Sequence, residues 1–411
     1  MPIADLTAEL VERLKYFSTQ LRRLFPNAST IRHRKQLSFS TSPELAKPAV
    51  EGIVRLVWLH ELYVRDRLSD LVEEAPAVGL TRIHLVDRFA PVEFLEIVRR
   101  NAPTLVDLCI SSMYRNIYKD VVLDSEGAVV VYPNLKRFEA SVTVYFGPTE
   151  LASQPSPEGV LFPVLQHLSV LGSYLFSNDL LFRGNNTTLE YLTLGIDTNI
   201  LETIETHHLF KPNSYPQLHY LDFLSRNIEH SATEQDAQAL LRTPFNLGPN
   251  LQVVKIGTSV YQLGPTILNC VQQSMLSSEI QHLDIGGILL SLNDAVSLVK
   301  VLPNLTMLGC GLHIEIEGQT KYLRAKDVKQ LYTDYFPVRS RLWYLKAEGN
   351  TRRPLRVMGE LACVFAILVP SIYRIGFQNY AGENRSYICK QAYKRPAFKR
   401  YADRFDALRF D

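Results

Sequence analysis

The sequence predicts an α/β solenoid, a stack of short parallel strands joined by return segments that include helices. Three observations support this fold. A motif that begins Leu-Pro-Asn-Leu at Leu302 recurs along the chain, its last two apolar residues are two positions apart, and its copies are mostly about 30 residues apart. Because a strand with one buried face alternates between buried and exposed residues, each copy of the motif predicts one strand.

The motif has the form Leu-x-x-Leu-x-apolar, and several copies carry a proline two residues before the first leucine. Proline fixes the φ angle and ends a preceding helix, so it suits a turn into the strand. The spacing, from about 21 to about 37 residues, matches leucine-rich repeats with a return helix. An ordinary α/β domain with leucine-rich strands is the alternative, but it gives no reason for the recurring proline. The first apolar positions of the copies are Leu59, Leu80, Leu105, Leu135, Leu165, Leu189, Leu218, Leu251, Ile280, Leu305, Leu342 and Ile372.

The repeats divide the chain into four parts. Residues 1–50 form an N-terminal helical cap and loop, with leucines at helical spacing over residues 3–25 and a candidate first strand at Thr30 to His33. Leucine-rich repeats occupy residues 51–311. Divergent repeats in residues 312–384 form a C-terminal cap, because a solenoid must close its open end with an atypical unit. A basic aromatic tail occupies residues 385–411. Return helices are expected at residues 66–75, 91–100, 234–242, 266–276 and 293–302, helices of the C-terminal cap at residues 323–336 and 355–369, and loops at residues 34–50, 144–161 and 213–216.

Composition is that of an ordinary folded protein, with 46% apolar and 21% charged residues in a chain of 411. The net charge of +2 creates no global field toward nucleic acid or membrane. Five scattered cysteines without a Cys-x-x-Cys pair indicate reduced thiols. The N-terminus has no signal-peptide core, and the apolar run from Leu361 to Val369 is about half a membrane span. We therefore expect a cytoplasmic or nuclear monomer without a membrane anchor.

One face of the predicted parallel sheet is the candidate binding surface. In each repeat, the residues before and after the second leucine and the residue after the third apolar position lie on the concave side. Tyrosine and arginine on a rigid face are typical of protein–protein hot spots, and both charge signs suit an extended protein or peptide ligand. A face that is merely solvated is the alternative. The candidate partner-binding residues are Tyr63, Arg65, Arg82, His84, Arg137, Glu139, His167, Tyr191, Tyr220, Asp222, Lys255, His282, Asp284, Tyr344 and Arg374.

The sequence does not indicate a catalytic, metal or cofactor site. His282 and Asp284 lie on one side of a strand but have no third ligand, so we interpret them as a surface pair. Cys109 beside His84 suggests a nucleophile, but no orienting residue or oxyanion hole accompanies them. The sequence has no phosphate-binding loop, no His-Glu-x-x-His and no Gly-x-Ser-x-Gly motif. We therefore expect a protein that is not an enzyme and uses no cofactor or metal.

The tail supports a second hypothesis. Residues 385–411 hold eight Lys or Arg and three Asp, interleaved with aromatic residues. This composition can bind RNA or single-stranded DNA through phosphate contacts and base stacking. The positions of Phe398, Tyr401, Phe405 and Leu408 also follow helical spacing, which favours a helix docked on the last repeats. Nucleic-acid binding by the tail is therefore the alternative to protein binding.

The segments Ala102–Ile110 and Leu302–Leu308 resemble the leucine-rich repeats of F-box proteins and of the wider ribonuclease-inhibitor-like superfamily. The resemblance covers most of residues 55–380 in a degenerate form, since the asparagine or cysteine that usually follows the last leucine is mostly missing. It implies a horseshoe with a parallel concave sheet, and a non-enzymatic protein-binding scaffold related to substrate receptors of ubiquitin ligases. The F-box that joins such receptors to a ligase adaptor is not evident in residues 1–25, which lack its Leu-Pro opening and its tryptophan.

Overall fold

The structure is a computed structural model. The chain divides into two compact units, Met1–Leu194 (unit 1) and Gly195–Asp411 (unit 2). The structure describes residues 30–32, 61–65, 79–86, 92–112, 121, 124, 126, 128–142, 159–171, 181–182, 184, 186–196, 213–225, 241–257, 264–274, 279–313, 330, 338–348, 355–378, 401 and 407–410.

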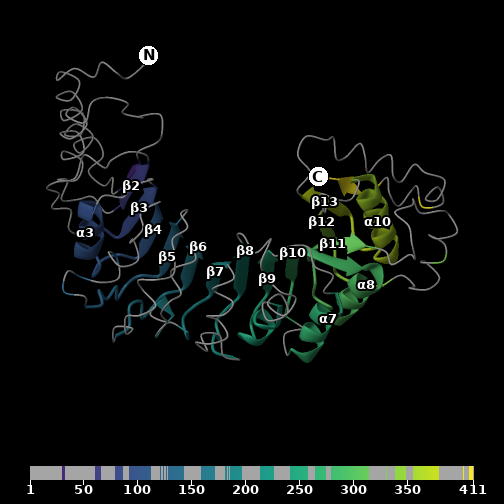
Figure 1. Cartoon of the computed structure of the whole chain (residues 1–411), viewed down its shortest axis with the longest axis horizontal. Helices are drawn as coiled ribbons and strands as arrows, with labels where there is room; N and C mark the ends of the chain where they lie inside the picture. Colours follow the sequence, from purple (N-terminus) through teal and green to yellow (C-terminus); the bar gives the residue numbers. More distant parts are fainter. Residues whose placement is uncertain are drawn as a thin grey trace, which may run out of the picture. The chain divides into compact units, whose positions relative to one another are not determined.

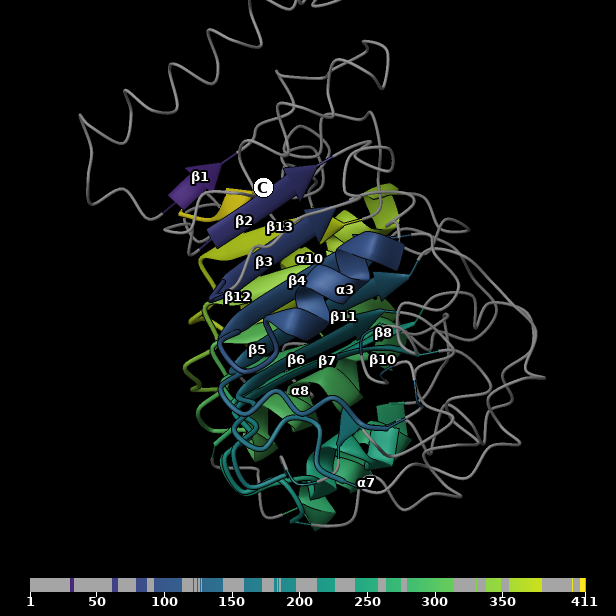
Figure 2. The ribbon, with the colours of Figure 1, turned by 90° about the vertical axis from the view of Figure 1, so that its left-hand side faces the viewer.

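Unit 1 contains an open parallel sheet whose strands follow the order of the chain (Figure 1). In Figure 2 the arrows of its strands β2 to β5 run side by side in one direction. The register aligns equivalent residues of successive repeats, so that Leu108 lies between Ile83 and Phe138. The strands are β1 (Thr30–Arg32), β2 (Glu61–Arg65), β3 (Arg82–Val86), β4 (Asp107–Ser112), β5 (Arg137–Val142), β6 (His167–Leu171) and β7 (Tyr191–Ile196), of which β7 crosses the unit boundary.

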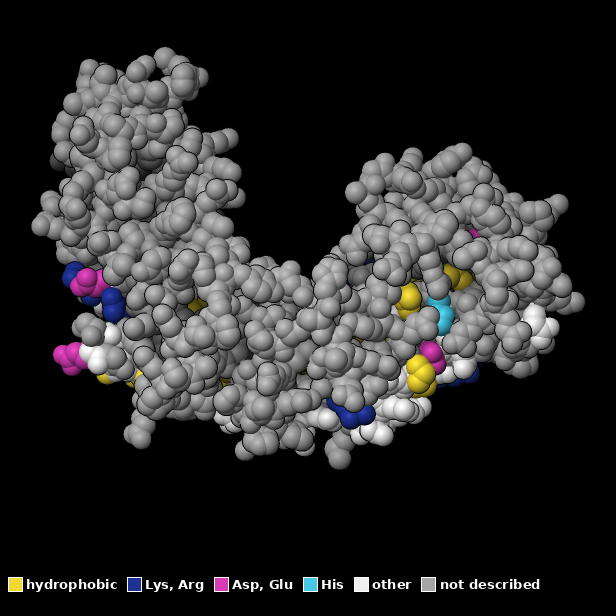
Figure 3. Space-filling model, viewed as in Figure 1, with side chains coloured by type: hydrophobic (Ala, Val, Ile, Leu, Met, Phe, Trp, Pro, Cys, Tyr) yellow, Lys and Arg dark blue, Asp and Glu magenta, His cyan; other side chains and the backbone are white. Residues whose placement is uncertain are grey.

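The return helix α3 (Val92–Arg100) connects β3 to β4 and buries Ile97 and Val98. Its exposed side carries the i,i+4 ion pair between Arg100 and Glu96. Over this part of unit 1, Figure 3 shows basic and acidic side chains next to each other. The helix therefore packs one apolar stripe inward and leaves a solvated charged face.

Unit 2 repeats this design with further helices (Figure 1). Its strands also pair in parallel and in chain order. The helix α8 packs on β10 and β11, and α10 packs on β11 and β12. The strands are β8 (Tyr220–Ser225), β9 (Val253–Gly257), β10 (His282–Ser291), β11 (Met307–His313), β12 (Tyr344–Glu348), β13 (Arg374–Gln378) and β14 (Arg409–Phe410), and the helices are the 3-10 helix η5 (Pro244–Asn246), α7 (Gly264–Gln273), α8 (Leu292–Val301) and α10 (Leu355–Leu368).

The core consists of the alternate strand residues that the leucine motif marks. In β9, Val254 and Ile256 are fully buried whereas Val253 and Lys255 are partly exposed. Strands that bury one face in this way leave the other face for polar residues. The architecture is thus an α/β fold on an open parallel sheet, which is compatible with a repeat solenoid.

The residue just before the first leucine links successive repeats. The side chain of Thr104 donates a hydrogen bond to the Leu80 carbonyl, and Thr188 donates to the Leu165 carbonyl. Asn134 donates to the Pro103 carbonyl in the same way. Each bond gives a turn carbonyl of the preceding repeat a donor, so these small polar residues help to fix the spacing between turns.

The structure confirms every strand that the leucine motif predicts, from β2 to β13, and the candidate first strand is β1. The helices expected at residues 91–100, 266–276, 293–302 and 355–369 correspond to α3, α7, α8 and α10. Residues 213–216 form the expected loop, with a positive φ at Asn213. The expected features at residues 3–25, 34–50 and 66–75, and most of those at residues 144–161, 234–242 and 323–336, lie outside the described residues.

Two expectations need correction. The helix expected to extend through Leu408 is wrong at its end, because Leu408 is not helical and Arg409–Phe410 pair with β13 as β14. An edge strand offers unpaired backbone groups, and these accept a short added strand more readily than a helix. In addition, β10 is twice the length of a typical repeat strand here, and after a register shift between Asp284 and Leu289 its second half pairs with β11.

The apolar run from Leu361 to Val369 is buried in and just after α10, as expected. Among the described residues, no helix combines the length and apolar character that a membrane span requires.

Candidate functional site

The side chains between the buried positions of unit 1 line one face of its sheet. On β3 to β5, Asp107 lies in register between Arg82 and Arg137, so the charges alternate across the strands. Opposite charges in neighbouring positions of a sheet contribute about 0.2–1 kcal/mol per pair. We call this surface the polar face of unit 1, with the residues Arg82, His84, Asp107, Cys109, Arg137, Glu139, His167, Ser169, Tyr191 and Thr193.

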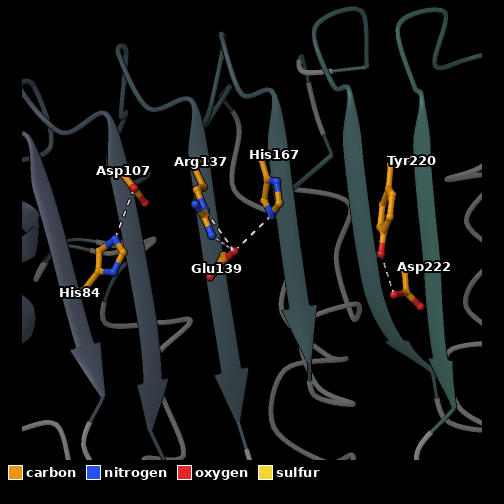
Figure 4. A network of polar contacts seen from close by, with 7 residues as sticks. All are labelled: His84, Asp107, Arg137, Glu139, His167, Tyr220 and Asp222. Carbon is orange, nitrogen blue, oxygen red and sulfur yellow. Dashed lines mark hydrogen bonds and ion pairs between the residues drawn. The ribbon is translucent and has the colours of Figure 1, made fainter. Parts of the chain in front are cut away.

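Polar contacts connect these side chains (Figure 4). Nε2 of His84 lies 3.3 Å from Oδ2 of Asp107. On the next strands, Oε1 of Glu139 lies 2.6 Å from Nη2 of Arg137 and 3.2 Å from Nε2 of His167. The ring of His167 stacks on Tyr191, with ring centroids 5.7 Å apart. Side chains that brace each other in this way lose less conformational entropy when a ligand binds.

Glu139 is the centre of the second group. The hydrogen bond from His167 is the main cause that lowers the pKa of the Glu139 carboxyl to about 2, and the hydrogen bond from Arg137 adds to it against the opposing effect of burial. The same Arg137–Glu139 hydrogen bond raises the pKa of Arg137. The Glu139 carboxylate therefore stays ionised to strongly acid pH.

Cys109 lies in register between His84 and Glu139. Burial, followed by the negative charge and the hydrogen bond of Glu139, raises the pKa of the Cys109 thiol to about 12. A nucleophilic cysteine needs a substantial thiolate fraction near neutral pH. This environment therefore gives no support to the nucleophile hypothesis.

Unit 2 carries an equivalent surface, the polar face of unit 2, with the residues Tyr220, Asp222, Lys255, His282, Asp284, Gly309, Tyr344, Lys346 and Arg374. The hydroxyl of Tyr220 donates to Oδ2 of Asp222, as Figure 4 shows, and accepts from Nζ of Lys255 at 2.8 Å. Burial raises the pKa of Asp222, against the opposing charge of Lys255. The three side chains therefore form one connected polar group.

A long-range ion pair crosses the strand β11. Nζ of Lys346 on β12 lies 2.6 Å from Oδ2 of Asp284 on β10. Gly309 occupies the aligned position on β11 between them. A Cβ atom at Gly309 would overlap Oδ1 of Asp284, so the absence of a side chain opens the path for this contact. A residue with a side chain at this position would have to displace the Asp284 carboxylate from its present place.

Aromatic residues lie on and next to β12 and β13, the last strands that contribute to the polar face of unit 2. The guanidinium of Arg374 lies 5.2 Å from the centroid of the Tyr344 ring, a cation–π contact. Gly376 on β13 leaves room for the Tyr344 hydroxyl, which a Cβ atom there would overlap. Trp343 stacks on both Tyr344 and Tyr373.

The sequence-predicted site residues from Arg82 to Arg374 thus lie in two sets, one on each unit. Tyr63 and Arg65 are part of β2, where their backbones lie opposite His84 and Val86. Sequence reasoning did not identify Gly309, Gly376 or the Trp343–Tyr373 stack. The available signal was an aromatic residue directly after the first apolar position of a repeat, which both Trp343 and Tyr373 provide.

Metal binding finds no support among the described residues, which contain no group of three His, Cys, Asp or Glu able to hold an ion. The Asp284 carboxylate is engaged by Lys346. Burial, followed by the charge of Lys255, lowers the pKa of His282.

The sequence matches no protein-family model and no curated protein.

Proposed function

We propose that this protein is a leucine-rich-repeat scaffold that binds a protein partner on the polar face of its sheet and catalyses no reaction. One observation carries the proposal. Side chains from neighbouring strands form aligned rows, brace one another through ion pairs, and still leave Arg137 and Tyr191 46% and 42% exposed. Exposed arginine and tyrosine on a rigid support are the residues that contribute most to protein–protein binding.

The sheet supports this role physically. Its strands hold the side chains about 4.8 Å apart, so an extended ligand that crosses the strands meets a regular series of groups. The alternating charges of Arg82, Asp107 and Arg137 neutralise one another in part and suit a ligand with both donors and acceptors. Binding of this kind requires no catalytic group, and the raised pKa of Cys109 accords with that.

The finer proposal follows the resemblance of the repeats. We infer a horseshoe solenoid related to F-box and ribonuclease-inhibitor-like repeat proteins, acting as a monomer in the cytoplasm or nucleus. In this role the polar face would hold the substrate of a ubiquitin ligase. The partner is then a protein or peptide segment that lies across the strands.

The proposal is tested by affinity purification of the full-length chain from lysate of its source, with partners identified by mass spectrometry. The variant Arg82→Glu/Arg137→Glu reverses the charge of two exposed positions on the polar face of unit 1. It is expected to lose the partners that the wild type recovers, while its circular dichroism spectrum stays unchanged.

The matched control is Arg100→Glu on α3. Arg100 is also exposed and also pairs with a glutamate, but it lies on a return helix and not on the polar face. Its partners are expected to remain. Unchanged recovery with the double variant, or equal loss with Arg100→Glu, would exclude the polar face as the binding surface.

A further inference from the structure

Exposed basic residues lie on and next to β12, β13 and β14, the last strands of unit 2. Arg374 on β13 and Arg409 on β14 are both exposed, and Arg339 and Arg341 are exposed in the segment that leads into β12. Within residues 338–348, 371–378 and 407–410, the acidic residue is Glu348, at the far end of β12. The described surface at the start of these strands is therefore positively charged.

Two of these arginines are direct cross-strand neighbours. Arg374 pairs with Arg409 in the register between β13 and β14. Like charges in directly opposite positions of a sheet destabilise it. Part of the charge of Arg374 is directed at the ring of Tyr344. The juxtaposition still favours an anionic ligand that can contact both guanidinium groups.

An aromatic stack lies at the same edge. The Tyr373 backbone N–H donates to the Trp343 carbonyl at 3.1 Å, which sets the two residues side by side. Their rings stack with centroids 5.2 Å apart and planes 16° apart. Trp343 also stacks on Tyr344, so it lies inside the stack, while Tyr373 is 46% exposed at its end. The exposed ring of Tyr373 thus belongs to the residue directly before Arg374 in the chain.

We infer that this basic-aromatic patch, formed by Arg339, Arg341, Trp343, Tyr373, Arg374 and Arg409, binds single-stranded nucleic acid. Arginines contact the phosphates, and an unpaired base stacks on Tyr373. An acidic peptide would use the arginines but gain nothing from the flat stack. A duplex keeps its bases paired and could not offer one to Tyr373. This site goes beyond the proposed protein-binding function. Arg409 is the one residue of the patch that belongs to the C-terminal tail, residues 385–411.

The test is fluorescence anisotropy of the full-length chain with a fluorescein-labelled oligouridylate of 12 nucleotides at 50 mM salt. Wild type is expected to bind it. Tyr373→Ala is expected to weaken binding by roughly fivefold to a hundredfold, the range for loss of one base–aromatic stack. Tyr373→Phe keeps the ring and is expected to bind like wild type. Arg374→Ala/Arg409→Ala is expected to flatten the dependence of log affinity on log salt by about 0.7 for each phosphate that is no longer neutralised.

Arg100→Ala on α3 is the control for general loss of charge and should leave affinity and salt slope unchanged. Circular dichroism verifies that each variant is folded. The inference is overturned by absence of oligouridylate binding in the wild type, or by equal affinity of wild type and Tyr373→Ala. It is also overturned if a labelled decaglutamate peptide binds more tightly than the oligonucleotide and depends on the arginines alone, since the patch would then be an acidic-peptide site.

Discussion

Replacing Gly309 by alanine tests how the polar face of unit 2 is built. At a compatible φ, a Gly→Ala change stabilises a protein by about 0.4–1 kcal/mol through the unfolded state. Gly309 has no positive φ that would oppose this gain. Its new methyl group would, however, overlap Oδ1 of Asp284 and lie 3.3 Å from the Asp284 Cα atom. Overpacking of this kind costs about 1–3 kcal/mol, so we expect a net destabilisation of about 1–2 kcal/mol.

The origin of that loss is separated by a double-mutant cycle with Asp284→Ala. Removing the carboxylate takes away the atoms that the methyl group overlaps, and with them the ion pair to Lys346. In the Asp284→Ala background, Gly309→Ala should therefore be neutral or stabilising by up to about 1 kcal/mol. The expected coupling energy between the two positions is about 1–3 kcal/mol.

Urea unfolding followed by tryptophan fluorescence measures these free energies, and Trp343 reports on the neighbourhood of Lys346. An unchanged m-value would show that the unfolded state is not altered. An equal cost of Gly309→Ala in both backgrounds would refute the argument, because the glycine would then serve some purpose other than admitting the Asp284–Lys346 contact.

Three further outcomes are expected. Gly248→Ala should destabilise unit 2 by about 1–3 kcal/mol in urea unfolding, because a Cβ atom there would collide with the Tyr215 backbone carbonyl, which cannot move away like a side chain. Asn101→Ala should cost about 1–3 kcal/mol, because the buried Asn101 side chain accepts from the Leu80 N–H and donates to the Ile97 carbonyl; a cost near zero would contradict this. Cys109, with its thiol pKa raised to about 12, should resist iodoacetamide in the folded protein at pH 8 and react on unfolding; rapid labelling in the folded state, read by mass spectrometry, would show that the thiol is not held protonated.

The strands could be predicted because the information is local. The motif residues of one repeat, Leu251, Val254 and Ile256, have the spacing of a strand with one buried face, and all three are buried. The same spacing in other repeats corresponds to parallel strands in chain order. β14 escaped prediction because two residues, Arg409 and Phe410, carry no periodic signal. The second half of β10 was not predicted, because it lies after the motif and is held by pairing with β11.

In the candidate site, too, one part could be predicted from local sequence and another part could not. Strand periodicity assigned residues such as Arg137 and Glu139 to the polar face, because alternation alone decides which side a residue takes. The contacts among them depend on the register between strands, as with Asp284 and Lys346, which are 62 residues apart. Gly309 has no side chain, so the sequence alone does not indicate a role for it. Its role follows from its position between Asp284 and Lys346 on the neighbouring strands.

Site-specific photo-crosslinking tests the central claim most directly. A benzoylphenylalanine in place of Tyr191, which is 42% exposed on the polar face of unit 1, should crosslink the protein partner recovered with wild type. The same group in place of Arg100 on α3 should not. Crosslinks from position 100 with none from position 191 would place the partner on the helices and contradict a polar face that binds protein.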